Sequence, residues 1–182
     1  AHLYFLEDVF NWTNNGVIYA LAAHLGTLIA VVLYQKNNIY SLMKDSFLKN
    51  NTSYLVYISI ASLPVILIGA IISIFFNDIY KSNLIIIGTS SIFGGILLDF
   101  SDKYKESHKI KKELTFQMAI ITGIFQIFAL VPGMSRSGTV ITALRLCSLN
   151  RNESIKFSLL SGIPILMVAS LYSFYELSNK DE

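Results

Sequence analysis

Charged residues are scarce in this sequence. Lysine, arginine, aspartate and glutamate make up 14% of its 182 residues, whereas a soluble domain averages about 25%. A chain of this size still needs a wetted surface when water surrounds it, so the shortage excludes an ordinary soluble globule and indicates that lipid replaces water over much of the surface. The mean hydropathy of +0.55 agrees with this, and a net charge of only +2 does not suggest a nucleic-acid binder.

Cysteine is nearly absent as well. Cys147 is the single one, which excludes an intrachain disulfide and a cysteine cluster for metal. Low-complexity stretches, domain linkers and repeats of solenoid period are also missing, so we expect one membrane domain over residues 1–182. The sequence opens with Ala1, and its first residues lack the features of a signal peptide. We therefore expect it to be a piece of a longer protein.

Long intervals without any charge are what the sequence does contain. Each is about the length of a bilayer-spanning helix, roughly 17–25 residues. Apolar residues fall on all sides of a helical wheel, as in Leu63–Phe76, which excludes a helix with one water-facing side. The pattern predicts an all-α integral membrane protein, a multi-span helical bundle. The predicted spans lie at about 14–35, 53–76, 82–100 and 155–176.

The stretch from about 114 to 149 does not fit a simple crossing. Leu114–Val131 is long enough, but Thr139–Leu149 is a helical run of only 11 residues, too short for a hydrocarbon core of about 30 Å at about 1.5 Å per residue. A re-entrant helical hairpin over this stretch puts eleven of the 14 basic residues on the cytoplasmic side, against Lys81 and Lys180 outside. The positive-inside rule favours the hairpin, whose tip then carries Arg136 deep in the membrane.

The tip of this hairpin is the segment Pro132–Gly138 (PGMSRSG). Non-helical backbone at membrane depth must be buried in protein or line a wet cavity. An arginine there costs about 2.5–3.5 kcal/mol or more and needs an anionic partner, but no carboxylate occurs between Glu113 and Glu153. The partner of Arg136 is therefore expected to be a ligand, and its planar guanidinium pairs phosphate oxygens bidentately.

The neighbouring residues also suit a phosphate. Gly133 and Gly138 allow a tight turn and close approach to a ligand, and a helix that starts near Thr139 would point its free N–H groups at the loop. Ser135 and Ser137 add hydroxyls. The alternative is a Pro-Gly helix break with serine caps and an arginine that pairs with a carboxylate from elsewhere in the fold.

This loop and its surroundings resemble the bacterial undecaprenyl-diphosphate phosphatase family of the bacitracin-resistance type, which is distinct from the PAP2 phosphatases. The resemblance extends over the whole chain. It rests on the combination of Pro132–Gly138 with Gly123–Gln126, Phe157–Leu160, Ile163-Pro164, Leu25–Val31 and Leu63–Gly69.

The resemblance implies a fold of six spans and two re-entrant hairpins, arranged as inverted repeats, whose tips meet in a cavity open to the outer leaflet. Ala1-His2 matches the end of the first hairpin. The preceding Glu-rich motif and the last spans of the second repeat are absent here. The chain then has roughly two thirds of the usual family length, truncated at both ends, and we expect this piece alone to be inactive.

The implied reaction is hydrolysis of undecaprenyl diphosphate to undecaprenyl phosphate and inorganic phosphate, which recycles the lipid carrier for cell-wall synthesis and gives bacitracin resistance. Arg136 would bind the diphosphate and stabilise charge on the phosphoryl group, and Ser135 would hold its oxygens. His2 is the candidate nucleophile or general acid/base, with a serine of the absent segment as the rival nucleophile. Gln126 either lines the cavity or makes a helix-to-helix hydrogen bond. The expected substrate-binding residues are Gly133, Ser137, Gly138, Thr139 and Gln126.

The remaining expectations concern cofactor, partners and location. A divalent cation, Mg²⁺ or Ca²⁺, is implied by the resemblance alone, because the sequence shows no cluster of ligands for one. The partners are the undecaprenyl diphosphate lipid and the membrane, without nucleic acid, and a homo-oligomer stays open. The location implied is the bacterial inner (plasma) membrane, with the active site facing the periplasm or outer leaflet. The alternative function is a transporter or flippase for a lipid phosphate or anion, because broken helices around an anion site at inverted repeats are also a transporter design.

Overall fold

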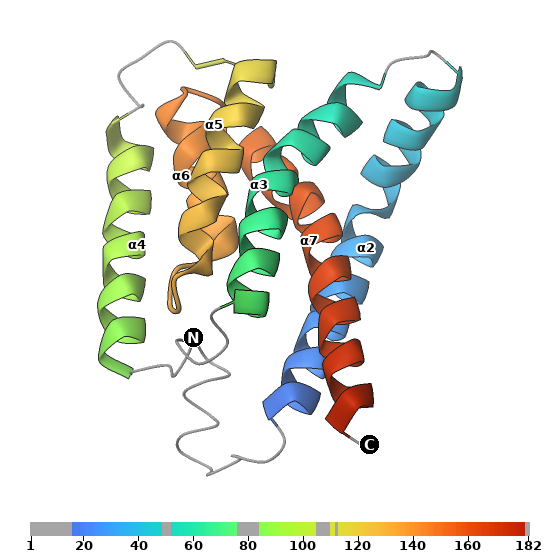
Figure 1. Cartoon of the computed structure of the whole chain (residues 1–182). Helices are drawn as coiled ribbons and strands as arrows, with labels where there is room; N and C mark the ends of the chain where they lie inside the picture. Colours follow the sequence, from blue (N-terminus) through green and yellow to red (C-terminus); the bar gives the residue numbers. More distant parts are fainter. Residues whose placement is uncertain (1–15, 49–51, 76–83, 105–109, 112, 181–182) are drawn as a thin grey trace.

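The computed structural model describes residues 16–48, 52–75, 84–104, 110–111 and 113–180. This part of the chain is almost entirely helical and contains no strand, and four of its helices are long and apolar enough to cross a membrane (Figure 1). The predicted all-α, multi-pass membrane bundle is thereby confirmed. Its elements are α2 (Gly16–Leu48), α3 (Ser53–Phe75), α4 (Leu84–Tyr104), α5 (Phe116–Ile127), the 3₁₀ turn η2 (Phe128–Leu130), α6 (Arg136–Leu146) and α7 (Arg151–Lys180).

The long helices extend beyond the predicted spans. Helix α2 continues to Leu48, well past the expected end at about residue 35, and α7 runs over Arg151–Lys180 where 155–176 was expected. A charge-free interval marks the part of a helix that faces lipid, whereas the helix itself ends where its backbone hydrogen bonds end. Lysines such as Lys36 and Lys44 are good helix formers, so they continue α2 out of the apolar zone.

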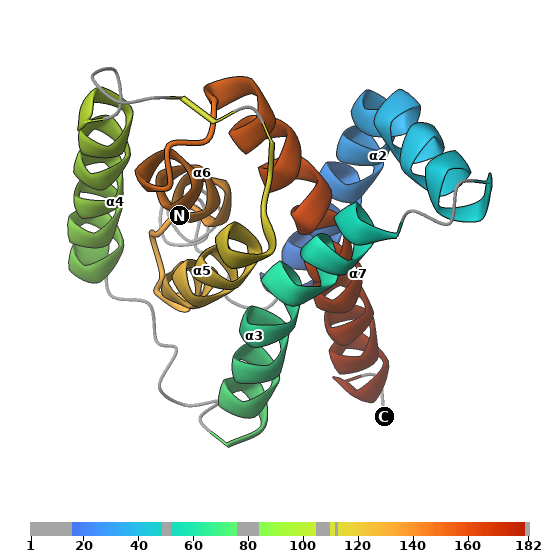
Figure 2. The same ribbon diagram turned by 90° about the horizontal axis from the view of Figure 1, so that it is seen from above.

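Helix α6 is packed on three sides. Seen from above, it stands between α4 on one side and the start of α7 on the other, with α5 beside it (Figure 2). A cluster of fully or almost fully buried apolar side chains joins α3, α5, α6 and the start of α7. Its members are Ala61, Met118, Val140, Leu144, Leu149 and Phe157. The short helix that carries the PGMSRSG arginine is therefore held by packing on several sides.

Close packing of α5 on α3 depends on a missing side chain. A Cβ on Gly123 would lie 3.0 Å from the carbonyl oxygen of Ile60 and 3.2 Å from Pro64 Cγ. Small residues at helix interfaces let backbones approach in this way in membrane proteins. Gly123 therefore sets how near the first arm of the hairpin lies to α3.

The two ends of the α5–α6 segment meet at one end of the bundle. Lys111 N donates to the carbonyl oxygen of Ser148 at 2.8 Å, and Asn150 N donates to the carbonyl oxygen of Lys111 at 3.0 Å. Neither arm is long enough to cross a bilayer, since α5 has 12 residues and α6 has 11. The segment is thus a helical hairpin in shape, and its re-entrant position in a bilayer stays a prediction.

A buried ion pair fixes the base of this hairpin to α4. Arg145 Nε lies 2.7 Å from Asp102 Oδ1, and the two side chains are only 7% and 22% exposed. The same guanidinium donates through Nη1 to the carbonyl oxygen of Leu149 at 2.9 Å, and Arg151 Nη2 lies 3.6 Å from Asp102 Oδ2. Arg145 therefore links α4, the end of α6 and the turn into α7.

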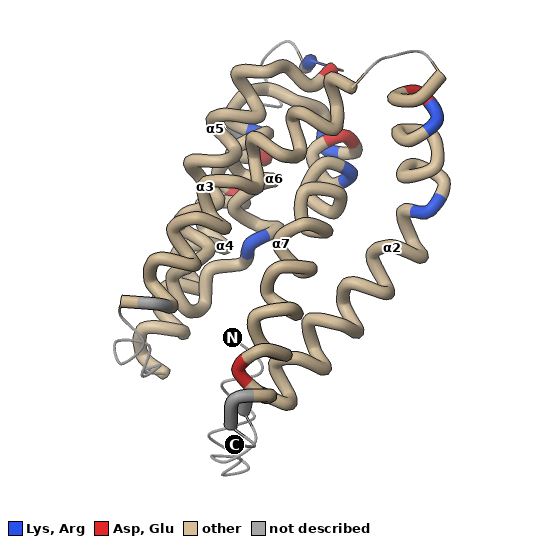
Figure 3. Tube along the Cα trace, turned by 45° about the vertical axis from the view of Figure 1, so that its right-hand side comes forward, with Lys and Arg blue, Asp and Glu red and all other residues tan. Residues whose placement is uncertain are grey.

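The described lysines and arginines gather toward one end of the molecule, the end at which the hairpin has its base (Figure 3). One basic position stands apart from them near mid-height, where α6 begins. That first residue of α6 is Arg136. The arrangement matches the charge asymmetry expected of a membrane protein with this hairpin.

Candidate active site

The connection between α5 and α6 is the non-helical segment that the sequence singled out. Gly133 within it has a φ of +99°, a left-handed conformation that glycine adopts at little cost. A Cβ at this position would also overlap Ser90 Oγ and the carbonyl oxygen of Ile87, both on α4. Glycine is required at position 133 for two independent reasons, its backbone conformation and its contact with α4.

Two serine hydroxyls of α4 hold the connection in place. Ser90 Oγ donates to the carbonyl oxygen of Pro132, and Ser91 Oγ donates to the carbonyl oxygen of Gly133 at 2.9 Å. Carbonyl groups outside a helix need such partners at membrane depth. Neither serine was predicted as a site residue, although two adjacent hydroxyl side chains inside an uncharged apolar interval were an available signal.

Ser135 caps α6 and sets its start. The Ser135 Oγ accepts from Gly138 N at 3.2 Å and lies 3.2 Å from Ser137 Oγ. The first intrahelical bond runs from Thr139 N to the carbonyl oxygen of Ser135 at 2.9 Å, so α6 begins at Arg136 and not near Thr139 as predicted. The N–H groups of Arg136 and Ser137 have no acceptor within the helix, and such a helix start favours an anion.

The Arg136 side chain lies against α7. Its Nη1 donates to the carbonyl oxygen of Ser158 at 2.8 Å. The guanidinium occupies the space that a side chain at position 162 would need, because an ideal Cβ on Gly162 would lie 2.5 Å from Arg136 Cζ and still closer to both Nη atoms. Within the described ranges no carboxylate forms an ion pair with Arg136. The carboxylate partner of the alternative interpretation is thus not found in this part of the chain.

The other predicted site residues differ in their surroundings. Gln126 is fully buried, and its Nε2 donates to the carbonyl oxygen of Ala61 at 2.8 Å, which is the helix-to-helix bond rather than the cavity-lining position. Thr139 Oγ1 donates to the carbonyl oxygen of Arg136 at 2.7 Å. His2 lies outside the described residues. In the part of the chain that the structure covers, no group of three His, Cys, Asp or Glu side chains could hold a metal ion.

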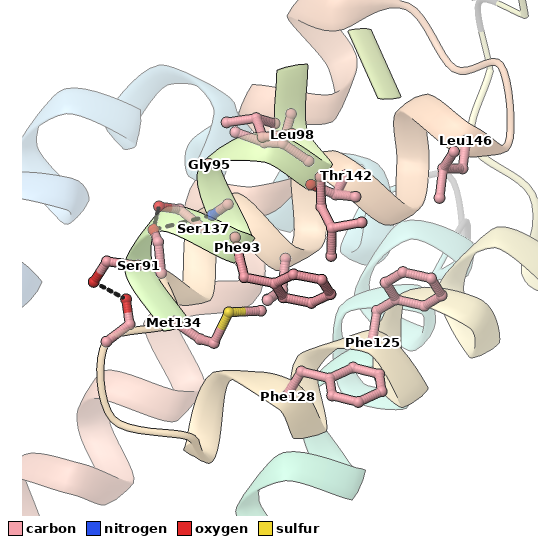
Figure 4. A pocket seen from close by; sticks show the side chains of 17 residues that line it. Ser91, Phe93, Gly95, Leu98, Phe125, Phe128, Met134, Ser137, Thr142 and Leu146 are labelled. Atoms are coloured by element: carbon pink, nitrogen blue, oxygen red, sulfur yellow. Dashed lines mark hydrogen bonds between the residues drawn. The ribbon is translucent and has the colours of Figure 1, made fainter. Parts of the chain in front are cut away.

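An apolar cavity of about 810 Å³ opens between α4 and the α5–α6 hairpin. Phe93 of α4 and the hairpin residues Phe125, Phe128 and Met134 project into it, and Ser137 lies at its side (Figure 4). The two phenylalanines of the hairpin pack edge to face with ring centroids 6.1 Å apart. The cavity that the resemblance implies lies where two hairpin tips meet; this apolar cavity against α4 was not predicted, because tertiary packing alone brings its walls together. The PGMSRSG loop thus has a guanidinium on its α7 side and an apolar cavity on its α4 side.

Comparison with known proteins adds two findings. The family model described as bacitracin resistance protein BacA matches residues 1–182. Similar curated proteins carry the name undecaprenyl-diphosphatase. The one from Pelagibacter ubique is 37% identical over 172 residues, covering 94% of this chain and 65% of its own length. The one from Marinobacter nauticus is 33% identical over 189 residues, covering 100% of this chain and 71% of its own length.

A third relative gives the same picture. The undecaprenyl-diphosphatase of Saccharophagus degradans is 33% identical over 178 residues, which covers 94% of this chain and 67% of that protein. The chain thus spans about two thirds of the length of the curated relatives it matches.

Proposed function

The chain belongs to the bacitracin resistance protein BacA family, and from this membership we propose that its protein is an undecaprenyl-diphosphatase. The reaction is hydrolysis of undecaprenyl diphosphate to undecaprenyl phosphate and inorganic phosphate, which returns the lipid carrier to cell-wall synthesis and gives bacitracin resistance. The observation that carries the proposal is the PGMSRSG loop. It brings an arginine, a helix start and two serine hydroxyls together at the tip of a hairpin inside a membrane bundle.

The loop has the groups that phosphoryl transfer needs. In this chemistry the protein mainly positions the phosphates and stabilises their developing charge. The guanidinium of Arg136 supplies a fixed positive charge, and the N–H groups of Arg136 and Ser137 precede the first bond of α6. Ser135 and Ser137 add hydroxyls that can donate to phosphate oxygens. Gly133 lets the loop turn tightly against α4, which holds these groups in place.

The other half of the chemistry comes from outside the described residues. The bond between the two phosphates breaks as the oxygen or nitrogen of a nucleophile bonds to the terminal phosphorus, and undecaprenyl phosphate leaves. Where the nucleophile is a side chain, a water molecule then attacks the same phosphorus, the bond to the side chain breaks and inorganic phosphate is released; where His2 is the general base, the nucleophile is that water. His2 is the proposed nucleophile or general acid/base, with a serine before Ala1 as the rival. Gln126 supports the hairpin through its bond to α3. Mg²⁺ or Ca²⁺ is proposed from the family resemblance alone, because the described residues contain no group of three His, Cys, Asp or Glu side chains that could hold it.

The same proposal fixes the setting of the enzyme. The protein would lie in the bacterial inner membrane with the hairpin base in the cytoplasm, and the hairpin would be re-entrant, with its tip reached from the outer leaflet. Helices α5 and α6 are short and their ends meet, which supports this arrangement. The relatives described above are named for a phosphatase, which favours hydrolysis over a transporter or flippase.

The test is phosphate release from undecaprenyl diphosphate by the full-length protein in detergent. Removal of one neutral hydrogen-bond donor to a developing oxyanion costs about 10²–10³-fold in rate, and an arginine at a phosphoryl transition state is worth more, so Arg136→Ala should lower release by at least about 10²-fold. The control is Lys44→Ala, which removes a basic residue near the carboxyl end of α2, away from the loop. This variant should keep wild-type activity. Retained activity in Arg136→Ala would contradict the assignment. The isolated segment 1–182 is expected to release no phosphate.

A further inference from the structure

The cavity beside the loop is lined mainly by apolar side chains, which a phosphate group does not need for binding. Its walls are formed largely by apolar side chains from three elements, α4, α5 with η2, and α6, among them Phe93, Leu97, Phe125, Phe128 and Ile141. A phosphate or a sugar in such a place would lose hydrogen bonds to water and regain few. An occupant of this cavity must therefore be apolar over most of its length.

One side of the cavity is the loop itself. Ser135, Ser137 and Gly138 line the cavity and also belong to the proposed phosphate site. The α4 wall and the loop form one unit, because Ser91 Oγ donates to the carbonyl oxygen of Gly133 at 2.9 Å. Arg136 leaves the loop in the other direction, toward Ser158 of α7. An apolar occupant that touches these serines would thus have its end beside the phosphate site.

We propose that this cavity binds the isoprenoid units next to the diphosphate of a polyprenyl diphosphate. The inference rests on the proposed function, because it takes the PGMSRSG loop as the phosphate site. The chain would lie between α4 and the hairpin, and the diphosphate would cross the Ser135–Ser137 rim toward Arg136. A volume of about 810 Å³ is that of a pocket for a drug-sized ligand, so only the first few units fit and the rest of the chain stays in lipid.

Two glycines of α4 provide a matched pair of variants. An ideal Cβ meets nothing within 4 Å at either Gly88 or Gly95, so a side chain can leave the backbone at both positions without a clash at its first atom. Only Gly95 lines the cavity. Gly95→Leu therefore fills the proposed chain site, whereas Gly88→Leu makes the same chemical change to the same helix outside it.

The direct experiment is photo-crosslinking in the full-length protein. The probe is a polyprenyl monophosphate with a diazirine on the isoprene unit nearest the phosphate, and the adducts are mapped by mass spectrometry. We expect adducts within 91–98 and 125–134, reduced at least fivefold by Gly95→Leu and unchanged by Gly88→Leu. Adducts confined to other helices, or equal yields in the two variants, would overturn the inference.

Kinetics and cysteine crosslinking complete the test. Gly95→Leu should raise the KM for undecaprenyl diphosphate about tenfold with kcat within twofold, and Gly88→Leu should match wild type. A wild-type protein that releases no phosphate would contradict the proposed function, while the adduct map still decides the position of the chain. A bifunctional thiol reagent tests whether protein covers the cavity, with Gly95→Cys as the reactive position. If the reagent joins this cysteine to another protein segment or to a second copy, and the lipid probe gives no adduct, the inference is wrong.

Discussion

The contact between Arg136 and Gly162 predicts that the variant Gly162→Ala keeps the stability of the wild type but loses most of its catalytic rate. Gly162 lies in the interior of α7 and leaves the space that the guanidinium fills. In Gly162→Ala the new Cβ would lie 2.5 Å from Arg136 Cζ, whereas non-bonded carbon atoms rest about 3.5–4.0 Å apart. The guanidinium must therefore withdraw by about 1 Å or more, and its 2.8 Å bond to the carbonyl oxygen of Ser158 is lost.

The magnitude follows from the size of this displacement. A misplacement of about 1 Å in a positioned group can cost about 10²-fold in rate, which corresponds to about 2.7 kcal/mol at about 1.36 kcal/mol per factor of ten. The fold should not suffer, because the displaced atoms are the far end of a flexible side chain. Replacing glycine by alanine in a helix interior even favours the helix by about 0.5–1 kcal/mol.

The assay measures both quantities in the full-length protein in detergent. We expect phosphate release from undecaprenyl diphosphate to fall about 10²-fold in Gly162→Ala, with a thermal unfolding midpoint equal to or above that of wild type. The control is Gly26→Ala in α2, where a Cβ meets nothing within 4 Å, and both of its values should stay near wild type. Activity of Gly162→Ala within twofold of this control would refute the view that α7 places the arginine for catalysis.

Three further substitutions test the packing that supports the loop, each by thermal unfolding of the full-length protein. Gly133→Ala should lower the midpoint and abolish phosphate release, since its φ of +99° alone costs about 1–3 kcal/mol for a side-chain-bearing residue; an unchanged midpoint would contradict this. Arg145→Met should destabilise by about 3 kcal/mol, because it leaves Asp102 without its 2.7 Å partner, and adding Asp102→Asn should restore part of the loss. Gly123→Val should destabilise by about 1–3 kcal/mol through overpacking, whereas Gly26→Val, which faces open space, should not.

The membrane fold could be predicted from the sequence because segments that contact lipid lack charged residues. Arg136 could be identified for the same reason, since it is an isolated charge between two apolar segments. The helix ends were less predictable: α2 runs on to Leu48 because its polar continuation forms a helix as readily as the apolar part. Periodicity and charge describe a helix's surroundings and not its length.

The contacts of the site could not be predicted, because they depend on which helices become neighbours. The guanidinium of Arg136 donates to the carbonyl oxygen of Ser158 and fills the space beside Gly162, which has no side chain. Neither contact can be recognised from the residue types in the sequence. For Gln126 a helix-to-helix hydrogen bond was one of two predicted alternatives, but nothing in the sequence identifies its partner Ala61, which lies 65 residues away in the chain. His2 and the cation stay predictions, since they depend on residues beyond the described part.

The hydrogen bonds and the ion pair between α4 and the hairpin have a consequence for the insertion of the protein during its synthesis. Ribosomes deliver the chain from its amino end, so Ser90, Ser91 and Asp102 emerge before the hairpin that they later bind. A hairpin entering bare lipid would expose the carbonyls of Pro132 and Gly133, at several kcal/mol for each unsatisfied group. Next to an inserted α4, those carbonyls meet hydroxyl donors at once. The order of the chain thus lets the short helices of the hairpin form beside a long helix that already offers their hydrogen-bond partners.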